Sequence, residues 1–447
     1  MTRNLLTADQ TAARLGVKVS TVYAYVSRGI LGRTVAPDGR TSRFDASEVE
    51  QLARRGRPRA DTRRAGTVDV VLATNLTGIL GDRLVYRGYD ATDLARTSTF
   101  EAVAELLWSG TLPGAVDPSD AGNPGDPGDP GDPGDPGESS GRPEPGGASA
   151  APWSAGPGTM KVARAVAATL PASSPVTERL AAVTATLACA NPLRIDLQPA
   201  AVQAHARSLT ATLVAVLPAM GPTGPGGSAR AGTDGSLAAE LWARLSSLAP
   251  TAKRVRVLDA AMILLADHEL ATSTLAARMA ASTRADPYAV VLSGLGAVSG
   301  LLHGAAGHAP FEMLEDARST GSPERAVAHA LATHGRVPGM GHPLYDEADP
   351  RAACLLELLL PLVGRRDRAT IEGVIDAATT TANARPNIDL ATAALAFALQ
   401  MPSAATEAIF DIARIAGWIA HAIEEYGEAP LRFRTRALYA GPSVPPT

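Results

Sequence analysis

Four ionisable side chains stand in sequence contexts unlike the surface of an ordinary helix. They are His268 in ADHEL, His303 in SGLLHGAAG, His342 in PGMGHPLYDEADPRA and Asp389 in PNIDL. Imidazole and carboxylate groups are the side chains that enzymes use most often to move protons. If the fold brings these residues together, they could carry acid–base chemistry.

Each of these residues also has an ordinary structural explanation. A single buried histidine is more often a core residue whose ring is hydrogen-bonded to a backbone carbonyl. Asp389 follows Pro386 and Asn387 and could cap the helix that begins after it. Arg351, in the DPRA segment, could form an ion pair on the surface. Three further residues are interpreted as structural: His308, His421 and Trp418.

The chain resembles citrate synthases over nearly all of residues 68–441. GILGDRLVYRGYDATDLARTSTFEAVAELLWSGTLP is similar to the family's N-terminal hairpin and first helices, and LYAG at 438–441 is similar to its C-terminal end. Between them the ADHE, LHGA, PGxGHxxY, DPRA, PNxD and IARIAGWIAH segments follow in the family's order with similar spacing. The resemblance implies a mainly α fold with a large and a small helical domain, and a homodimer.

This resemblance also implies roles for the four ionisable residues. A carboxylate must take a methyl proton from an acyl thioester, and a donor must face the negative charge that grows on the thioester oxygen. By resemblance Asp389 is that base and His303 is that donor, an uncharged imidazole in apolar, glycine-lined surroundings. His342 would protonate the ketone oxygen of a 2-oxo dicarboxylate, which His268 would help to orient.

The implied reaction condenses acetyl-CoA with oxaloacetate to give citrate and CoA. Citrate carries three carboxylates, which suit planar guanidinium groups. By resemblance these groups are Arg351, Arg414 and Arg434, the last supplied across the subunit boundary of the dimer. The acyl-CoA is a substrate, and no tightly bound cofactor or metal is implied. Closure of the small domain would exclude water until condensation is complete, and Gly339 and Gly341 could form a tight turn near the site or be simple loop glycines.

The sequence departs from the family's usual pattern at three points. Ala271 stands where members commonly have Asn, Ala305-Ala306-Gly307 followed by His308 replaces Gly-Ala-Asn, and Pro343 follows the GH pair. The first two changes remove polar groups near the oxo-acid and acyl sites. A propionyl group differs from acetyl by one methylene, worth about 1–3 kcal/mol in a pocket. A 2-methylcitrate synthase that uses propionyl-CoA is therefore an alternative.

The first 66 residues form a basic segment with a different pattern. They hold 13 Arg and Lys against 6 Asp and Glu, a net charge of +7, which leaves −11 for the rest of the chain. Thr7 and Ser20 are predicted to cap two helices joined by a tight turn, and the apolar positions Ala12, Leu15, Val17, Val22 and Val26 face one core. A hairpin turned at residues 37–39 should follow.

This pattern resembles the small winged helix-turn-helix domains of the excisionase and MerR-like kind. A third helix, capped by Asp45 or Ser47, is expected after the hairpin. The second helix would enter a major groove, exposing Tyr25 among its polar side chains. The candidate DNA contacts are Lys18, Thr21, Tyr23, Arg28, Arg40 and Arg43. A small helical module for protein contacts or dimerisation is the alternative.

Two segments rich in proline and glycine interrupt the larger part of the chain. They lack the apolar side chains needed for packing, so we predict disordered insertions near 114–157 and 220–235. Long surface insertions add loop entropy only slowly, so one domain can continue across them. The expected divisions are the helix-turn-helix domain at 1–54, a charged linker at 55–67, the citrate synthase-like domain at 68–441 and a tail at 442–447.

Helical periodicity dominates this larger domain. The longest uncharged run, Pro287 to Phe311, could span a bilayer by length, but it holds five glycines and two histidines and lacks flanking anchors. We interpret it as a buried helix. Apolar spacing near 3.6 predicts helices within residues 176–217, 236–285, 288–316, 323–334, 351–383 and 389–424.

Length and composition fit a large globular protein. With 447 residues, 45% of them hydrophobic, the chain can bury a sizeable core. Cys189 and Cys354 are far apart and support neither a disulfide framework nor a zinc cluster, which favours a reducing compartment, the cytoplasm. The first residues, MTRNLLTADQ, lack the apolar core of a secretory signal.

Two classes of function agree with these patterns. The first is an active condensing enzyme whose N-terminal module binds DNA or a protein partner. The second is a regulator in which a catalytically weak synthase fold senses oxaloacetate or an acyl-CoA and alters DNA binding. The retention of both Asp389 and His303 favours the enzyme, because a sensor would need neither.

Overall fold

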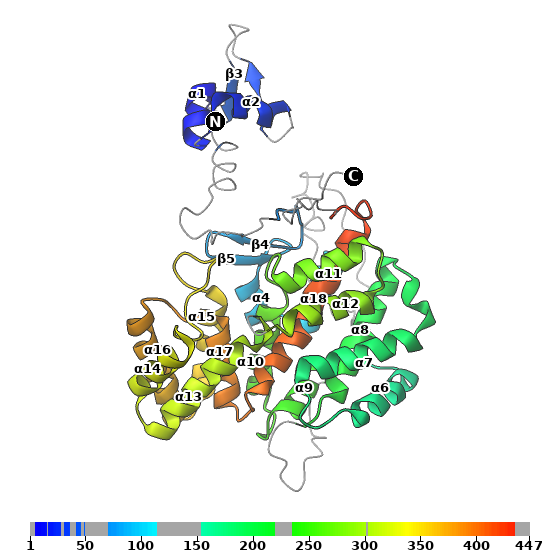
Figure 1. The fold of residues 1–447 in the computed structure, drawn as a ribbon, viewed down its shortest axis with the longest axis vertical. Helices are drawn as coiled ribbons and strands as arrows, with labels where there is room; N and C mark the ends of the chain where they lie inside the picture. Colours follow the sequence, from blue (N-terminus) through cyan, green and yellow to red (C-terminus); the bar gives the residue numbers. More distant parts are fainter. Residues whose placement is uncertain are drawn as a thin grey trace, which may run out of the picture. The chain divides into compact units, whose positions relative to one another are not determined.

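The computed structural model of the chain describes residues 5–15, 17–27, 31–35, 42–45, 49, 70–113, 153–219, 235–300 and 303–433. These residues belong to two compact units, and each is treated by itself (Figure 1). The first unit covers residues 1–73 and the second covers 74–447. The predicted linker at 55–67, most of both predicted insertions and the segment at 438–441 lie outside the described residues.

The first unit pairs two short helices with a small antiparallel sheet. Its elements are β1 (Leu5–Thr7), α1 (Ala8–Leu15), α2 (Val19–Ser27), β2 (Thr34–Val35) and β3 (Ser42–Asp45). The strand order is β1-β3-β2, and Thr34 lies opposite Arg43 in the register. Strands β2 and β3 are the arms of the predicted hairpin, whose turn lies outside the described residues.

One of the two predicted caps in this unit is confirmed. Thr7 and Gln10 form a reciprocal capping box, in which the Thr7 N–H donates to Gln10 Oε1 (2.9 Å) and the Gln10 N–H donates to Thr7 Oγ1 (3.2 Å). The prediction for Ser20 is wrong. Helix α2 begins at Val19, and the Lys18 carbonyl accepts its first hydrogen bonds, so Ser20 already lies in the first turn.

The apolar pattern of the first 50 residues is confirmed by the core of this unit. Its buried members are Ala12, Val22, Leu31, Phe44 and Val49. Leu15, Val17 and Val26 pack against them. Tyr25 also packs against this core, so the expectation that α2 exposes Tyr25 is wrong.

The second unit begins with a three-stranded antiparallel sheet in the order β4-β5-β6. Its strands are β4 (Thr77–Leu80), β5 (Arg83–Tyr86) and β6 (Tyr89–Asp90). Leu80 lies opposite Arg83, so two residues turn the first hairpin. This sheet occupies the place of the hairpin that the sequence predicted.

Helices make up nearly all of the remaining described residues of this unit. They are α4 (Ala91–Thr97), α5 (Phe100–Ser109), α6 (Pro157–Thr169), α7 (Val176–Ala190), α8 (Pro199–Val216), α9 (Leu237–Leu245), α10 (Ala252–Leu265), α11 (Thr272–Ser282), α12 (Pro287–Val298), α13 (His308–Thr320), α14 (Pro323–His334), α15 (Pro350–Leu359), α16 (Arg365–Ala382), α17 (Ile388–Ala398) and α18 (Ala404–Tyr426). Short 3₁₀ turns join some of them, at Pro192–Ile195, Gly304–Gly307 and Leu360–Leu362. None of the described helices combines the length and the apolar character that crossing a membrane requires.

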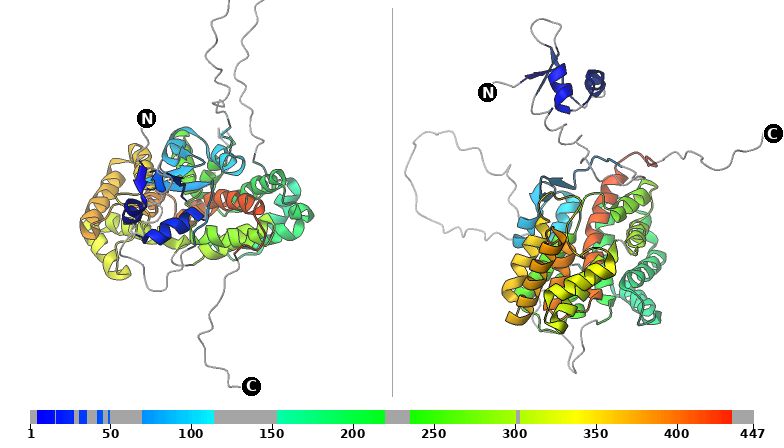
Figure 2. Two further views of the ribbon diagram at one scale, coloured as in Figure 1. Left: turned by 90° about the horizontal axis from the view of Figure 1, so that it is seen from above. Right: turned by 60° about the vertical axis from the view of Figure 1, so that its left-hand side comes forward.

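Two groups of helices meet along α17 and α18. Helix α18 packs against α5, α7, α8, α10, α11 and α12, whereas α13 to α17 pack mainly among themselves (Figure 1). Both views in Figure 2 show α13 to α17, in yellow to orange, on the opposite side of α18 from the green helices α6 to α8. This division agrees with the expected large and small groups of helices.

The run from Pro287 to Phe311 is two helices, and the interpretation as one buried helix is wrong. Helix α12 ends at Val298, and α13 begins at His308 after a 3₁₀ turn. Glycine is a poor helix former, and Gly307 lies so close to α18 that a Cβ atom would come within 2.6 Å of the Thr406 side chain. The break places His303 in the turn between α12 and α13, outside either helix.

The predicted insertion near 114–157 extends too far at its C-terminal end. The Trp153 ring stacks on the Trp108 ring, with ring centroids 5.2 Å apart, and meets Phe100 edge-on at 5.9 Å. Aromatic pairs of this kind bury a large apolar area. Helix α6 then begins at Pro157, so residues 153–157 belong to the packed part of the unit.

Candidate active site

The turn that carries His268 is fastened to two neighbouring elements. The last carbonyl groups of a helix have no partner within it, and the end of α10 is held by groups from other elements. Three consecutive oxygens accept hydrogen bonds: Leu265 from Arg414 Nε (2.8 Å), Ala266 from the Gly417 N–H (3.0 Å) and Asp267 from the Tyr86 hydroxyl (2.9 Å). The position of His268 is therefore set jointly by α18 and β5.

His268 and His342 lie side by side with Tyr345. His268 Nε2 is 2.9 Å from the Tyr345 hydroxyl, and the two imidazole rings meet edge to face with centroids 4.9 Å apart. Burial lowers the pKa of His268 far below its ordinary value, and the positive charges of Arg351 and Arg414 lower it further. His268 is therefore an uncharged ring that can donate or accept a hydrogen bond.

A tight backbone turn presents His342. Gly339 and Gly341 both have positive φ, +74° and +72°, a conformation that favours glycine. A Cβ atom on Gly339 would come within 2.7 Å of Leu390 Cβ, so this turn lies directly against the first turn of α17. The Leu344 N–H donates to His342 Nδ1 (3.2 Å), so Nδ1 is an acceptor and the ring proton lies on Nε2. Of the two readings left open for these glycines, the tight turn is correct.

Asp389 lies in the first turn of α17 but does not cap it. The cap is Asn387, whose Oδ1 accepts from the N–H groups of Asp389 (3.0 Å) and Leu390 (3.4 Å). The Asp389 carboxylate is therefore not needed for the helix end. Burial raises the pKa of Asp389 above its ordinary value, although the positive charge of Arg351 opposes the shift.

Arg351 is buried, so the alternative of a surface ion pair is wrong. Its side chain is 3% exposed and forms a two-pronged pair with Asp349, from Nε to Oδ1 (2.9 Å) and from Nη2 to Oδ2 (2.8 Å). Asp349 also accepts the N–H of Ile388 (3.0 Å), which joins α15 to α17. Nη1 keeps its hydrogen-bonding capacity toward a ligand, since no residue of the described chain accepts from it.

His303 lies in the turn after α12. Its Nε2 is 2.9 Å from the hydroxyl of Ser273 on α11, and its ring meets Phe410 of α18 edge-on at 5.7 Å. Burial lowers the pKa of His303 to about 4, and the positive charge of Arg414 adds to the effect. At neutral pH the ring is uncharged. If the Ser273 hydroxyl donates to Nε2, Nδ1 carries the proton and can donate it to a ligand.

Arg414 links the separate parts of this region. Its guanidinium lies over the Phe410 ring at 4.6 Å and donates through Nε to the Leu265 carbonyl. Within the described residues neither terminal amino group has a hydrogen-bond acceptor, so both remain able to hold a carboxylate. Its charge acts on the pKa values of His268, His303 and Asp389.

The structure brings six of the seven sequence-predicted site residues into one electrostatic neighbourhood around Arg351 and Arg414. The seventh, Arg434, lies outside the described residues. Sequence reasoning did not single out three residues that hold the others in place, namely Ser273, Tyr345 and Asp349. Tyr345 and Asp349 belong to motifs that were recognised, so motif spacing could have flagged them. Nothing in the sequence indicates that Ser273 meets His303.

A cavity of about 430 Å³ opens beside this group. Ligand sites commonly have volumes of about 300–1,000 Å³. Its lining includes His342, Tyr345 and Asp349, together with Asn383, Ala384 and Arg385, which precede α17. The cavity therefore gives a small molecule access to His342 from solvent.

Helix α11 begins without a side-chain cap. Ala271 occupies the N-cap position with extended backbone (φ −52°, ψ 156°) and has no group that could accept a hydrogen bond. Asparagine is among the best N-cap residues, and its replacement by alanine commonly costs about 1 kcal/mol. The alanine at this position therefore leaves the helix that carries Ser273 without the stabilisation of a side-chain cap.

Replacing Ala271 by Asn is expected to stabilise the second unit by about 1 kcal/mol, because the amide oxygen would accept a free N–H group of the first turn of α11. Thermal unfolding followed by far-ultraviolet circular dichroism measures the gain as a higher melting temperature. Ala271→Gln is the matched control, since its longer side chain carries the same amide but caps poorly. Equal melting temperatures for the two variants would contradict the explanation.

In the first unit, the described candidate DNA contacts gather at the start of α2 and on the hairpin. Lys18 is exposed, Thr21 is half-buried, and Tyr23 is exposed with its ring edge-on to Phe44. Arg43 is half-buried on β3. Arg28 and Arg40 lie outside the described residues. The Tyr23 hydroxyl donates to Ser42 Oγ (3.4 Å), so α2 and β3 lie side by side.

Two family models match the chain. The model for the C-terminal domain of citrate synthase matches residues 66–122 and 150–436, and a helix-turn-helix domain model matches residues 5–57. The first covers most of the second unit on both sides of the insertion. The second covers the segment in which the structure has α1, α2 and the hairpin.

Curated proteins and solved structures give the same picture. A citrate synthase of Haloferax volcanii is 32% identical over 386 residues, which cover 83% of this chain and 94% of that protein. A 2-methylcitrate synthase of Shewanella oneidensis is 26% identical, covering 83% and 92%. The structure of a citrate synthase from Thermoplasma acidophilum, in a ternary complex with carboxymethyl coenzyme A and oxaloacetate, aligns with a TM-score of 0.60 at 21% identity, covering 85% of this chain and 96% of that one.

Proposed function

Because this chain belongs to the citrate synthase family and carries a helix-turn-helix domain at its N-terminus, we propose that it condenses acetyl-CoA with oxaloacetate and that its first unit binds DNA. Family membership makes it an acyltransferase of the kind that converts the acyl group into an alkyl group on transfer. The products proposed here are citrate and free CoA.

The first step breaks a C–H bond of the acetyl methyl group. Asp389 takes the proton, and the electron pair moves onto the thioester to form an enolate. Nδ1–H of His303 faces the enolate oxygen and stabilises its charge, which an uncharged imidazole can do without giving up its proton fully. The raised pKa of Asp389 suits this role, because a base closer to working pH transfers protons with a better driving force.

The second step forms the C–C bond. The enolate carbon attacks the ketone carbon of oxaloacetate, and the ketone oxygen takes a proton from Nε2 of His342 as it becomes an alcohol. The Leu344 N–H at Nδ1 fixes the tautomer that has this proton in place. Water then hydrolyses the citryl thioester, which releases the CoA thiol.

Oxaloacetate is held as a dianion between guanidinium groups. We assign one carboxylate to Nη1 of Arg351 and the other to the terminal amino groups of Arg414, with His268 donating to the ketone side of the acid. Arg434 would reach the site from the partner subunit of a homodimer. Buried arginines suit this role because their charge persists and their fork geometry matches a carboxylate.

One observation carries the proposal. Arg414 lies close enough for its charge to lower the pKa of both Asp389, a carboxylate that does not cap α17, and His303, an uncharged hydrogen-bond donor. The test is the release of CoA thiol from acetyl-CoA and from propionyl-CoA, side by side, with oxaloacetate as acceptor. We expect turnover with acetyl-CoA at a higher kcat/KM. A higher value with propionyl-CoA would make the protein a 2-methylcitrate synthase, and no turnover over a broad panel would refute the enzymatic proposal.

The rate is expected to fall in acid with a midpoint above the ordinary aspartate pKa of about 3.9. Asp389 must be ionised to act as base and its pKa is raised, so protonation removes the base at a higher pH than usual. His303 keeps its uncharged form down to about pH 4, so its protonation does not determine the fall of the rate in acid. The measurement is kcat/KM from pH 4.5 to 8.5, with circular dichroism at each pH to verify folding. A midpoint near 6.5 would instead indicate that a histidine governs the rate.

DNA binding by the first unit is tested on the full-length chain with a duplex at increasing salt. Neutralisation of phosphates releases counterions, so affinity should fall linearly on a double-logarithmic plot. Lys18→Gln should weaken binding at all sequences and reduce the slope by about one unit. Affinity that is indifferent to salt would contradict DNA binding and favour a module for protein contacts.

A metabolite-sensing regulator remains the second candidate. By resemblance, Ala271 and Gly307 stand where relatives commonly carry Asn, which favours a weakened active site. In that case oxaloacetate or acetyl-CoA would change the DNA affinity of the full-length chain, whereas thiol release would stay at background. A chain that turns over acetyl-CoA and whose DNA affinity ignores both ligands excludes this candidate.

A further inference from the structure

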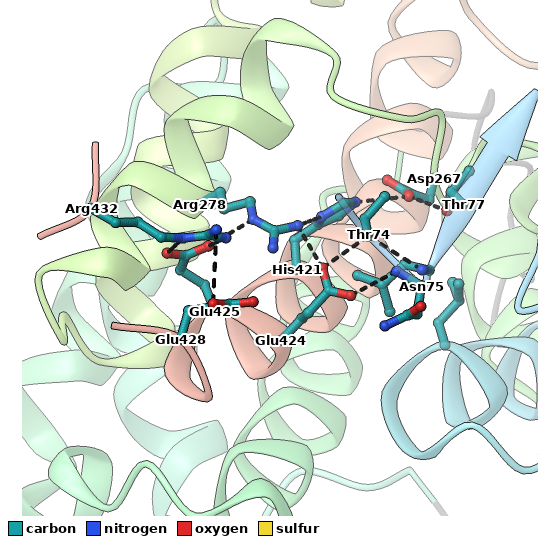
Figure 3. Close-up of polar contacts among 12 residues, drawn as sticks. Thr74, Asn75, Thr77, Asp267, Arg278, His421, Glu424, Glu425, Glu428 and Arg432 are labelled. Carbon is teal, nitrogen blue, oxygen red and sulfur yellow. Dashed lines mark hydrogen bonds and ion pairs between the residues drawn. The ribbon is translucent and has the colours of Figure 1, made fainter. Parts of the chain in front are cut away.

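A chain of buried ionisable side chains runs beside the candidate site and takes no part in the reaction proposed above (Figure 3). Its members come from the turn after α10, from α11, from α18 and from the segment after α18: Asp267, Arg278, His421, Glu425 and Arg432. The first four are fully buried, and Arg432 is a quarter exposed at the outer end. His421 lies in the middle of this chain, and both of its ring nitrogens contact charged side chains, those of Arg278 and Asp267.

The inner end of the chain is the residue that directly precedes His268. Asp267 Oδ2 accepts from the Thr77 hydroxyl and from His421 Nε2, which is 3.0 Å away. Helix α18 reaches this turn only because residue 417 is glycine, since a Cβ atom there would lie 2.5 Å from both Asp267 Oδ1 and the Ala266 oxygen. Any movement of α18 at this point is therefore passed to the turn that carries His268.

The hydrogen bonds fix the proton positions on His421. Arg278 Nη1 lies 2.9 Å from His421 Nδ1, and a guanidinium can only donate. Nδ1 is therefore an acceptor, and the single ring proton sits on Nε2, where it is donated to Asp267. The His421 ring therefore accepts a hydrogen bond from Arg278 on one side and donates one to Asp267 on the other.

The outer end leads to the segment that precedes Arg434. Arg278 Nε donates to Glu425 Oε2 (2.8 Å), and Glu425 accepts both Nε (2.7 Å) and Nη2 (2.6 Å) of Arg432. Nearby, the Leu431 N–H donates to the carbonyl of Ser282, at the end of the helix that carries Arg278. Leu431 and Arg432 are thus fastened to α11 and α18.

A side branch ties the same arginine to the start of the sheet. Arg278 Nη1 is 2.7 Å from Glu424 Oε2, which also accepts the Thr74 hydroxyl (2.9 Å), while Glu424 Oε1 accepts the Asn75 N–H (2.8 Å). Figure 3 shows the two branches meeting at Arg278. The residues just before β4, which holds Asp267 through Thr77, are therefore connected to the same centre.

Stability alone does not explain so many buried charges. Removing charges from water is costly, and well-packed apolar residues of similar volume are often at least as stabilising as a buried ion pair. Two buried atoms of the chain, Asp267 Oδ1 and Arg278 Nη2, have no hydrogen-bond partner among the described residues, which adds to the cost. Directional bonds have one advantage over apolar packing, which is that they fix orientation.

We propose that Asp267, His421, Arg278, Glu425 and Arg432 form a positioning relay, centred on His421, that couples the turn bearing His268 to the segment after α18. Under the proposed function, on which this inference rests, His268 binds the oxo acid of this chain's own site, whereas Arg434, two residues after Arg432 in the sequence, serves the site of the partner subunit. The relay therefore predicts that a substitution at Arg432 disturbs the turn that carries His268. A substitution at His421 should disturb both ends of the relay.

The experiment uses four variants of the full-length chain. Arg432→Gln cuts the outer end, and His421→Leu cuts the centre. His421→Gln keeps one donor and one acceptor and should restore the connection. Arg207→Gln is the matched control, because Arg207 and Glu105 form a two-pronged pair of similar geometry and exposure between α8 and α5, away from the site.

Two measurements are made on each variant: amide hydrogen exchange of residues 266–270, which needs no turnover, and KM for oxaloacetate against KM for acetyl-CoA. We expect at least threefold faster exchange at 266–270 in Arg432→Gln and tenfold in His421→Leu, with KM for oxaloacetate rising in the same order and KM for acetyl-CoA unchanged. His421→Gln should stay within threefold of the wild type, and the control should show neither change.

The relay is refuted if residues 266–270 exchange at the same rate in Arg432→Gln and in Arg207→Gln. It is also refuted if His421→Gln shows the same increases in exchange and in KM for oxaloacetate as His421→Leu. A wild-type chain without turnover would refute the proposed reaction instead. The exchange measurement would then still decide whether the two segments are coupled.

Discussion

Replacing Asp389 by Asn is expected to lower turnover by a factor of about 10²–10⁴, the usual contribution of a general base. The amide has nearly the same shape but cannot accept the methyl proton. Because Asn387 and not Asp389 caps α17, the helix should keep its start. The measurement is kcat for thiol release with saturating oxaloacetate and acetyl-CoA.

The same substitution should leave the second unit as stable as before or more stable at neutral pH. The folded-state pKa of Asp389 is raised, so ionisation of this group destabilises the folded chain above that pKa, and the neutral amide removes the penalty. Asp376→Asn, which removes an exposed carboxylate on α16, is the matched control and should leave turnover unchanged. Retention of more than about a tenth of wild-type turnover in Asp389→Asn would contradict the role of base.

Local sequence patterns predicted the helices of the second unit well where no tertiary contact interfered. The range 323–334 coincides with α14, which has serine before it and glycine after it as ordinary helix boundaries. The prediction of one helix from Pro287 to Phe311 was wrong. The break in this run depends on the close approach of Gly307 to Thr406, about a hundred residues away in the sequence. Apolar character alone does not reveal such a contact.

The site residues were found by motif, but their alternatives were decided only in three dimensions. Whether Asp389 is a cap or a free carboxylate depends on which of two neighbouring residues takes the cap, and the backbone gives it to Asn387. Whether Arg351 is on the surface depends on the packing of α15 against α17. The contact between Ser273 and His303 joins the first turn of α11 to the turn after α12 and has no sequence pattern of its own.

The second large effect concerns stability rather than turnover. Replacing Arg351 by Leu is expected to destabilise the second unit by about 3 kcal/mol, at the lower end of the cost of breaking a buried ion pair. The lower end applies because Asp349 keeps two backbone donors, the N–H groups of Arg351 and Ile388. Urea unfolding followed by the helical circular dichroism signal measures the loss.

The loss should depend on pH in a definite direction. Although burial alone would raise it, the Arg351 guanidinium holds the pKa of Asp349 below its ordinary value. A depressed folded-state pKa gives stability that is present above the unfolded value, about 3.9, and is lost as pH falls through the folded-state value. In Arg351→Leu the pKa of Asp349 rises, so the penalty is greatest near pH 7 and shrinks as acid neutralises the carboxylate.

A double variant separates the two roles assigned to Arg351. Arg351→Leu with Asp349→Asn removes the unpaired buried charge and should recover part of the lost stability, because an amide is cheaper to bury than a carboxylate. It should not recover oxaloacetate binding, since the guanidinium that we propose holds the acid is still absent. Stability that fails to recover would show that Arg351 acts through its packing against the Tyr345 ring, 5.7 Å from its guanidinium carbon, rather than through its charge. Oxaloacetate binding that survives in the double variant would instead place the acid on other cations, and would move the proposed site away from Arg351.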